Sequence, residues 1–277
     1  MTNTSQQVGW EFWGSELKNR REGAGLSQEE MGRRLFASHA LISRFESAER
    51  RPRLDMAIQI DQVLETDGFF ERLCRKLLEA SPYASYFAAV AELERVATRI
   101  CEFESMSVPG LLQTAAYARA VTLAGNPYAT DEYIEGLVRA RLERATILKG
   151  EDRPSYWAVL HEAVLRVPVG GPTAMAEQLE HLTQLARERK IVMQIFPFAA
   201  GPYPSMGRMV TVMEFDDAPP TAYTEGVYSG NLLDEPAVVK RTQQSYDLIR
   251  AAALSPEASL ALIESAAEDY KRCASTT

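Results

Sequence analysis

The spacing of apolar residues divides the chain into a helical first part and a mixed second part. In the first 80 residues, apolar positions recur every three or four residues in short stretches, which predicts short helices joined by brief turns. Ser81-Pro82-Tyr83 interrupts this pattern, because proline disfavours helix at the residue before it. We therefore expect an all-α domain over residues 1–80 and a second domain over residues 81–277.

The second domain is predicted to mix helices and strands, because helical periodicity alternates with runs of β-branched and aromatic residues. Helices are expected at about 85–104, 131–149 and 175–190, and strands at 191–196, 208–215 and 221–228. Two further helices close the chain, and the last opens with Ser255 as cap and Pro256 at its first position. The expected fold class is an N-terminal all-α domain followed by a mixed α/β domain.

Two helix starts lie close together in the first domain. Ser27 can accept a hydrogen bond from the third helical amide while Glu30 reaches back to the cap, which is a capping box. Eleven residues later Ser38 offers a second cap. Two short helices joined by a tight turn, with a third element beginning at Leu54, form the layout of a helix-turn-helix.

The second of these helices separates its surfaces. At about 100° per residue, Leu41, Ile42 and Phe45 fall on one side and are expected to face the core. The opposite side is polar and carries one arginine, which fits a major groove where arginine binds guanine with two hydrogen bonds. The residues predicted to read or line base edges on that side are His39, Ala40, Ser43 and Arg44.

The first domain carries a basic cluster within ten residues of the chain: Arg44, Arg50, Arg51 and Arg53. The chain has a net charge of −8, but residues 1–80 hold 12 basic and 13 acidic residues and contribute only −1 of it. DNA binding needs basic groups facing phosphates rather than a basic protein. Free amides at the two helix starts also suit phosphates. The predicted phosphate contacts are Ser27, Gln28, Ser38, Arg50, Arg51 and Arg53.

Residues 17–64 resemble the Xre-type, phage-repressor-like helix-turn-helix family. The densest matches are Leu26-Ser27-Gln28-Glu29-Glu30 and Ile42-Ser43-Arg44-Phe45-Glu46. The resemblance implies that Gln28 touches a phosphate beside the binding site, that the outward face of the second helix meets base edges, and that Arg21 and Glu46 form an internal ion pair.

The sequence departs from that family at two positions. Phe36 stands where glycine is usual at a helix end, which indicates an altered turn or a left-handed residue. Gly32 replaces the usual alanine where helices pack, at a loss of about 1 kcal/mol of helix propensity. Neither departure removes an expected DNA contact.

The second domain resembles a domain of unknown function that follows Xre-type helix-turn-helix domains in actinobacterial regulators. The segments that carry this resemblance are 108–114, 161–166, 178–182 and 195–198. It implies a bacterial regulator, often paired with a small separately encoded partner protein, and it implies no chemistry.

Motifs for catalysis, cofactors and metals are missing from the sequence. His161-Glu162 begins like a zinc-protease helix, but the second histidine is replaced by Leu165. The three cysteines lie far apart without CxxC spacing, which favours free thiols in a reducing cytoplasm over a zinc site or disulfides. No apolar run is long enough to cross a membrane. We therefore expect no enzyme activity, no metal or cofactor and no membrane association.

The sequence predicts a sequence-specific transcription regulator that binds double-stranded DNA as a homodimer on a near-palindromic operator. Its second domain is expected to carry the dimer contact and to respond to a small-molecule effector or a small partner protein. The alternative is an antitoxin-like or sequestering protein that binds a partner and whose DNA contact is autoregulatory. Glu104, Glu162 and Glu225 lie among apolar residues, and whether they form internal hydrogen bonds or bind a ligand stays open.

Overall fold

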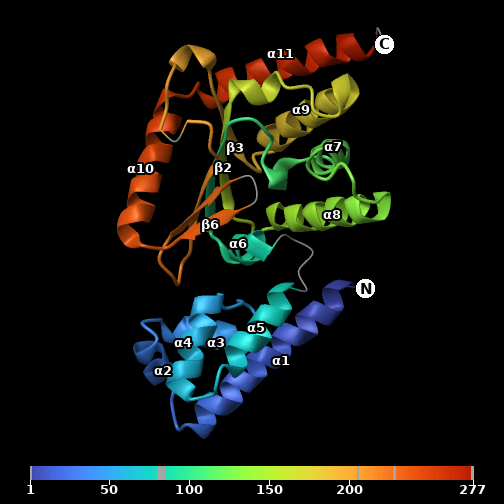
Figure 1. The fold of residues 1–277 in the computed structure, drawn as a ribbon. Helices are drawn as coiled ribbons and strands as arrows, with labels where there is room; N and C mark the ends of the chain where they lie inside the picture. Colours follow the sequence, from blue (N-terminus) through green and yellow to red (C-terminus); the bar gives the residue numbers. More distant parts are fainter. Residues whose placement is uncertain (1, 80–84, 205, 227–228, 276–277) are drawn as a thin grey trace. The chain divides into compact units, whose positions relative to one another are not determined.

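The structure is a computed structural model that describes residues 2–79, 85–204, 206–226 and 229–275, and it divides into two compact units. The first unit comprises residues 1–96 together with Phe215–Pro219, and the second comprises residues 97–214 and 220–277. The predicted fold class, an all-α first domain and a mixed α/β second domain, is confirmed (Figure 1). The helix that ends at Val96 belongs to the first unit by its contacts, and the domain boundary after residue 80 stays a prediction.

The first unit is built from helices around one core. They are α1 (Thr2–Gly23), α2 (Gln28–Arg34), α3 (His39–Glu46), α4 (Leu54–Leu64), α5 (Phe69–Glu79) and α6 (Ser85–Val96). Helix α1 is longer than the short helices expected at this end, because Trp10, Trp13 and Leu17 lie on one of its faces and are fully buried. The Trp13 ring packs edge-on against Phe45 and Phe70, which ties α1 to α3 and α5.

The turn between α2 and α3 explains both departures from the family pattern. Phe36 adopts a left-handed conformation with φ 53° and is 99% exposed, so its side chain gains no packing in return for the strain. This turn brings the backbone of Ala37 onto α2, where the Ala37 amide donates to the Gly32 carbonyl at 2.8 Å. A Cβ at Gly32 would lie 2.6 Å from the Ala37 carbonyl oxygen, so glycine is required for this close approach.

The second unit contains a six-stranded sheet in the order β3-β2-β1-β4-β5-β6. Its strands are β1 (Arg99–Glu104), β2 (Ser155–His161), β3 (Val192–Phe196), β4 (Val210–Glu214), β5 (Thr221–Glu225) and β6 (Gly230–Leu233). Strands β1, β2 and β3 run parallel to one another, whereas β1 pairs with β4 antiparallel and β4, β5 and β6 form an antiparallel meander. The parallel strands therefore need long helical crossovers between them.

The prediction of helix over 85–104 is wrong after residue 96, where β1 follows α6. Strand β1 lies between β2 and β4, so both of its edges are hydrogen-bonded. Its side chains are buried on both faces, with Cys101 and Phe103 on one face and Ile100 and Glu102 on the other. A doubly buried strand shows no clean polar alternation, which is why the segment was mistaken for the continuation of a helix.

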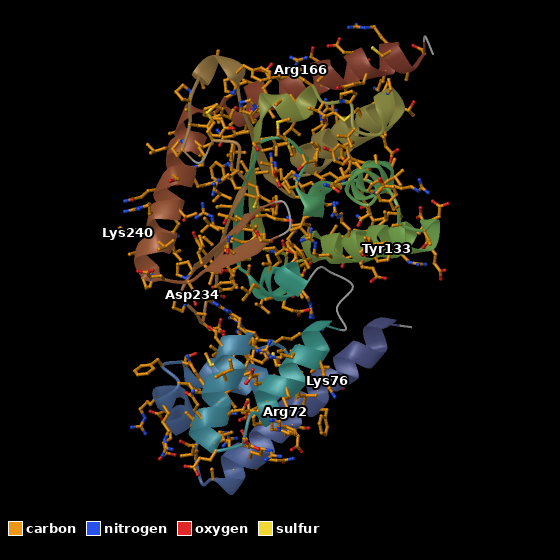
Figure 2. The ribbon with its side chains drawn as sticks, in the orientation of Figure 1. Arg72, Lys76, Tyr133, Arg166, Asp234 and Lys240 are labelled. Atoms are coloured by element: carbon orange, nitrogen blue, oxygen red, sulfur yellow. The ribbon has the colours of Figure 1, made fainter. Side chains whose placement is uncertain are left out.

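Helices cover both faces of the sheet (Figure 1). On one side lies α10 (Pro236–Ala252), whose buried Tyr246 and Ile249 pack with Phe103 and Val212 of the sheet while Lys240 projects away from it (Figure 2). The other side carries the following helices: α7 (Ala115–Gly125), α8 (Asp131–Arg144), α9 (Gly171–Arg187) and α11 (Pro256–Ala274). Over the residues that the structure describes, we find no helix with the length and apolar character needed to traverse a bilayer.

Candidate nucleic-acid interface

The start of α2 is fixed by a complete capping box. The Ser27 Oγ accepts from the Glu30 amide at 3.1 Å, and the Ser27 amide donates to Glu30 Oε2 at 2.8 Å. The Ser27 hydroxyl also donates to Glu30 Oε2, at 2.7 Å, and the hydrogen bonds from the Ser27 amide and hydroxyl lower the pKa of the Glu30 carboxyl, since they favour its charged form. The arrangement leaves the first amides of α2 in a defined direction, as an anion contact requires.

Helix α3 separates a buried face from an outward face as the periodicity predicts. Its cap, Ser38, accepts from the Leu41 amide at 3.1 Å. Leu41, Ile42 and Phe45 are buried in the core. The outward residues are His39 and Ser43, which are exposed, and Ala40 and Arg44, which are half-buried.

Arg21 and Glu46 form the ion pair that the family resemblance implies. Arg21 Nε and Nη2 lie 2.5 and 3.1 Å from the two carboxylate oxygens of Glu46, and Arg21 Nη1 donates to the Leu26 carbonyl at 2.7 Å. The hydrogen bond to Glu46 raises the pKa of Arg21. Gln28 Nε2 also donates to Glu46, at 2.8 Å. This places the Gln28 amide group in the network between α1 and α3, so that it does not project freely toward a phosphate.

Arg44 and Arg50 share one carboxylate. Arg50 Nη1 donates to Asp217 Oδ1 at 2.9 Å, and Arg44 Nη1 lies 3.2 Å from Asp217 Oδ2. The Arg50 guanidinium also stacks over the Phe215 ring, 4.7 Å from its centroid. Only 8% of the Arg50 side chain is exposed, against 41% of the Arg44 side chain. Burial lowers the pKa of Arg50, and Asp217 offsets part of that effect.

Arg51 is also held inside the first unit, whereas Arg53 is partly exposed. Arg51 pairs with Glu92 of α6 and lies over the Trp10 ring, with 7% of its side chain exposed. Burial raises the pKa of Glu92, and the Arg51 charge offsets part of that rise. Arg53 lies 3.3 Å from Asp55 and keeps 28% of its side chain exposed. The expectation that the basic cluster presents Arg50 and Arg51 to phosphates therefore does not describe this structure, in which only Arg44 and Arg53 of the cluster reach solvent.

Sequence reasoning missed Asp217 and Glu92. Asp217 is separated from Arg50 by 167 positions and Glu92 from Arg51 by 41. The signal for Asp217 was a pair of adjacent aspartates before Ala218-Pro219-Pro220, which marks only a turn between two strands. Nothing local in the sequence connects that turn with α3.

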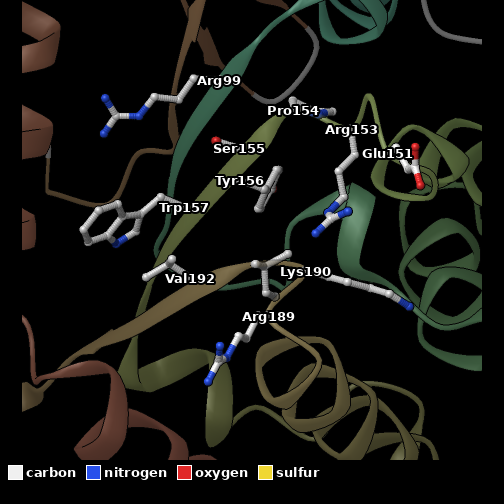
Figure 3. A pocket seen from close by; sticks show the side chains of 11 residues that line it. Arg99, Glu151, Arg153, Pro154, Ser155, Tyr156, Trp157, Arg189, Lys190 and Val192 are labelled. Atoms are coloured by element: carbon white, nitrogen blue, oxygen red, sulfur yellow. The ribbon is translucent and has the colours of Figure 1, made fainter.

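The second unit holds a basic pocket of about 610 Å³ at the start of β2. Figure 3 shows its side chains along the start of β2, with Trp157 at one side and basic groups from three separate segments of the chain. The charged residues that line it are Arg99, Glu151, Arg153, Arg189 and Lys190. Arg99 pairs with Glu214, and Lys190 with Glu188. The balance of charge therefore stays positive mainly through Arg153 and Arg189, which favours an anionic ligand over a cationic one.

The three carboxylates left open by the sequence have different surroundings. Glu162 accepts from the Phe198 amide at 3.1 Å and pairs with Arg166 at 3.1 Å, so its role is structural. Burial raises the pKa of Glu104 well above its usual value, and the neighbouring charges of Glu102 and Glu225 raise it further. An acidic cluster of this kind does not by itself identify a ligand.

Comparisons with known proteins also divide the chain in two, between residues 74 and 87, so that most of α6 and the segment Phe215–Pro219 fall in the second matched region. Residues 14–74 match a family described as a helix-turn-helix domain, which indicates a DNA-binding regulator. Residues 87–265 match a domain of unknown function, DUF5753. Neither the comparison with curated proteins nor that with solved structures gave a match. Because the second match spans more than half of the chain, the protein belongs to the DUF5753 family, and a helix-turn-helix domain precedes that family's domain.

Proposed function

We propose that the protein is a sequence-specific transcription regulator of the Xre type, of the kind found in actinobacteria, and that it has no catalytic activity. The observation that carries this proposal is α3, whose core face is buried while His39, Ser43 and Arg44 remain on its outward side. The capped starts of α2 and α3 support it, because the first amides of a helix have no partner within the helix and suit phosphates.

Arg44 is the residue that we assign to base recognition. It is the basic residue of the outward face of α3, and a guanidinium binds guanine O6 and N7 with two hydrogen bonds. Arg53 lies after α3 at the start of α4 and is assigned to the phosphate backbone. These two assignments differ in what they predict, because base contacts carry sequence information and phosphate contacts do not.

Arg44→Ala should weaken binding to the operator by about tenfold, which corresponds to about 1.4 kcal/mol, and should leave binding to unrelated duplex almost unchanged. The operator is first identified by footprinting the purified full-length protein across the genome. Fluorescence anisotropy with operator and scrambled duplexes at one fixed salt concentration then measures both affinities.

Arg53→Ala is the matched control, since it also removes one arginine. It should weaken binding to the operator and to the scrambled duplex by the same factor. It should also reduce the slope of log affinity against log salt concentration by about one unit. An Arg44→Ala variant that lost affinity equally for both duplexes would contradict the base-reading role.

The regulator is further proposed to act as a homodimer on a near-palindromic operator. One helix-turn-helix makes few base contacts, and joining two makes binding of the second half-site intramolecular. We expect two chains per operator, with half-sites about 34 Å apart. Sedimentation of the full-length protein with operator duplex measures this stoichiometry, and one chain per duplex at saturation would exclude the dimer.

Control of DNA binding through the second unit is proposed to involve a small anionic effector or a small partner protein. The basic pocket beside Trp157 supports the first of these, because its volume lies in the range of sites for small molecules. An effector alters DNA affinity only if it binds one conformation better than the other, so operator DNA must alter effector affinity by the same factor.

A further inference from the structure

The outward face of α3 is in contact with an acidic segment of the same chain. This acidic segment, Phe215–Pro219, belongs to the first unit and connects β4 with β5 in the sequence. Its Asp217 is 9% exposed at the side chain and lies between Arg44 and Arg50. The Ser38 hydroxyl lies 3.5 Å from the Asp217 carbonyl oxygen, at the long end of the hydrogen-bond range.

These contacts use groups that DNA would need. A carboxylate, a phosphate and the acceptor edge of guanine are alternative partners for the same guanidinium N–H groups. Arg44 therefore cannot turn its guanidinium fully to a base while it pairs with Asp217. A DNA backbone placed beside α3 would also bring phosphate charges near the Asp217 carboxylate, and like charges repel.

The two arginines are held with different strength. Arg50 donates a hydrogen bond to Asp217 and stacks on Phe215, and it is almost completely covered. The contact between Arg44 and Asp217 Oδ2 is an ion pair whose geometry falls short of a hydrogen bond, and Arg44 stays 41% exposed. Arg50 and Phe215 thus anchor the acidic segment, while Asp217 neutralises the arginine that faces outward.

We propose that Asp217 is an internal competitor of DNA: the acidic segment pairs with Arg44 on the recognition face of α3 and lies beside the Ser38 cap, while His39 and Ser43 stay exposed, and operator binding requires its displacement. This inference rests on the proposed function, because it concerns regulation of the same site. The structure is then the closed state of the first unit. The apparent DNA affinity equals the affinity of the open state multiplied by the fraction of molecules in which the segment has left α3.

Asp217→Asn should bind operator DNA about tenfold more tightly than the unaltered protein, which corresponds to an open fraction of about one tenth before the substitution. The variant keeps the size of the side chain and removes its charge. Asp216→Asn is the matched control, because Asp216 is exposed, adjacent and equally charged. Fluorescence anisotropy with full-length proteins and operator duplex at constant salt should show Asp216→Asn within about twofold of the unaltered protein.

The outcomes separate this inference from the proposed function. Equal affinities for the two variants, or weaker binding by Asp217→Asn, would overturn the competition while leaving operator binding intact. If neither the unaltered protein nor Asp217→Asn distinguishes operator from scrambled duplex, the proposed function fails, and the competition fails with it. Binding that is detectable only for Asp217→Asn would support both.

A second measurement uses the unaltered protein and so does not depend on how a variant folds. Hydrogen exchange of the amides in the acidic segment is compared with and without saturating operator duplex. Because competition is reciprocal, DNA should displace the segment and speed exchange across 215–218. Unchanged or slower exchange in the bound state would show that DNA and the segment occupy α3 together, which overturns the proposal.

Discussion

Glu46→Ala should lower the free energy of unfolding of the first unit by about 3–5 kcal/mol, the usual cost of removing one partner from a buried ion pair. Arg21 is 6% exposed and stays protonated, so its charge remains buried after the carboxylate is lost. Its hydrogen bond to the Leu26 carbonyl and its contact with Glu22, 3.4 Å from Nη2, survive. A carbonyl does not neutralise the charge, and Glu22, whose side chain is 55% exposed, offsets it only in part. The Gln28 amide loses its acceptor in the same substitution. The largest effect is therefore on folding, ahead of any effect on DNA recognition.

Urea unfolding followed by the fluorescence of Trp10 and Trp13 measures this change, because both indoles are buried in the core of the first unit. Glu49→Ala is the matched control: Glu49 is exposed and lies three residues after Glu46. It should change the free energy of unfolding by no more than about 0.5 kcal/mol. Equal unfolding midpoints for the two variants would show that the ion pair does not stabilise the unit.

Gly32→Ala should destabilise the first unit by about 2 kcal/mol, although helix propensity alone predicts the opposite sign. Alanine gains about 1 kcal/mol in a helix interior relative to glycine. Its Cβ would lie 2.6 Å from the Ala37 carbonyl oxygen, a backbone atom that cannot rotate away. Overpacking of this kind costs up to about 3 kcal/mol. The overlap therefore outweighs the gain in propensity, and the urea midpoint should fall.

Gly23→Ala provides the comparison within the same unit. A Cβ added at Gly23 meets no atom within 4 Å, so the same substitution there adds only helix propensity. Its urea midpoint should stay the same or rise. A Gly32→Ala variant as stable as Gly23→Ala would mean that the turn after α2 relaxes without cost.

Features that depend on neighbouring residues were predictable from the sequence. The caps at Ser27 and Ser38 follow from residue types within three positions, and the buried face of α3 follows from the turn of a helix. The left-handed Phe36 was recognisable because glycine is usual there. The need for glycine at position 32 was not predictable from the sequence, because it arises from the close approach of the Ala37 backbone in the folded structure.

Features that depend on distant partners were not predictable. The arginine cluster looked like a row of phosphate contacts because its acidic partners lie far along the chain. Ion pairs between residues far apart in the sequence depend on tertiary packing, and a single sequence does not show which distant residues pack together. The same limit applies to β1, whose two neighbours in the sheet, β2 and β4, begin more than fifty and more than a hundred residues after it.

The membership of the acidic segment in the first unit has a consequence for timing during synthesis. About 120 residues separate the end of α6 from Asp217, and chains grow at about 5–20 residues per second. Small helical domains fold in microseconds to milliseconds, so α1 to α6 can be folded for about 6–24 s before Asp217 exists. If Asp217 competes with DNA as proposed, a chain still on the ribosome carries an uncovered recognition helix. Arg44 is then free of Asp217 during the seconds before the acidic segment leaves the ribosome.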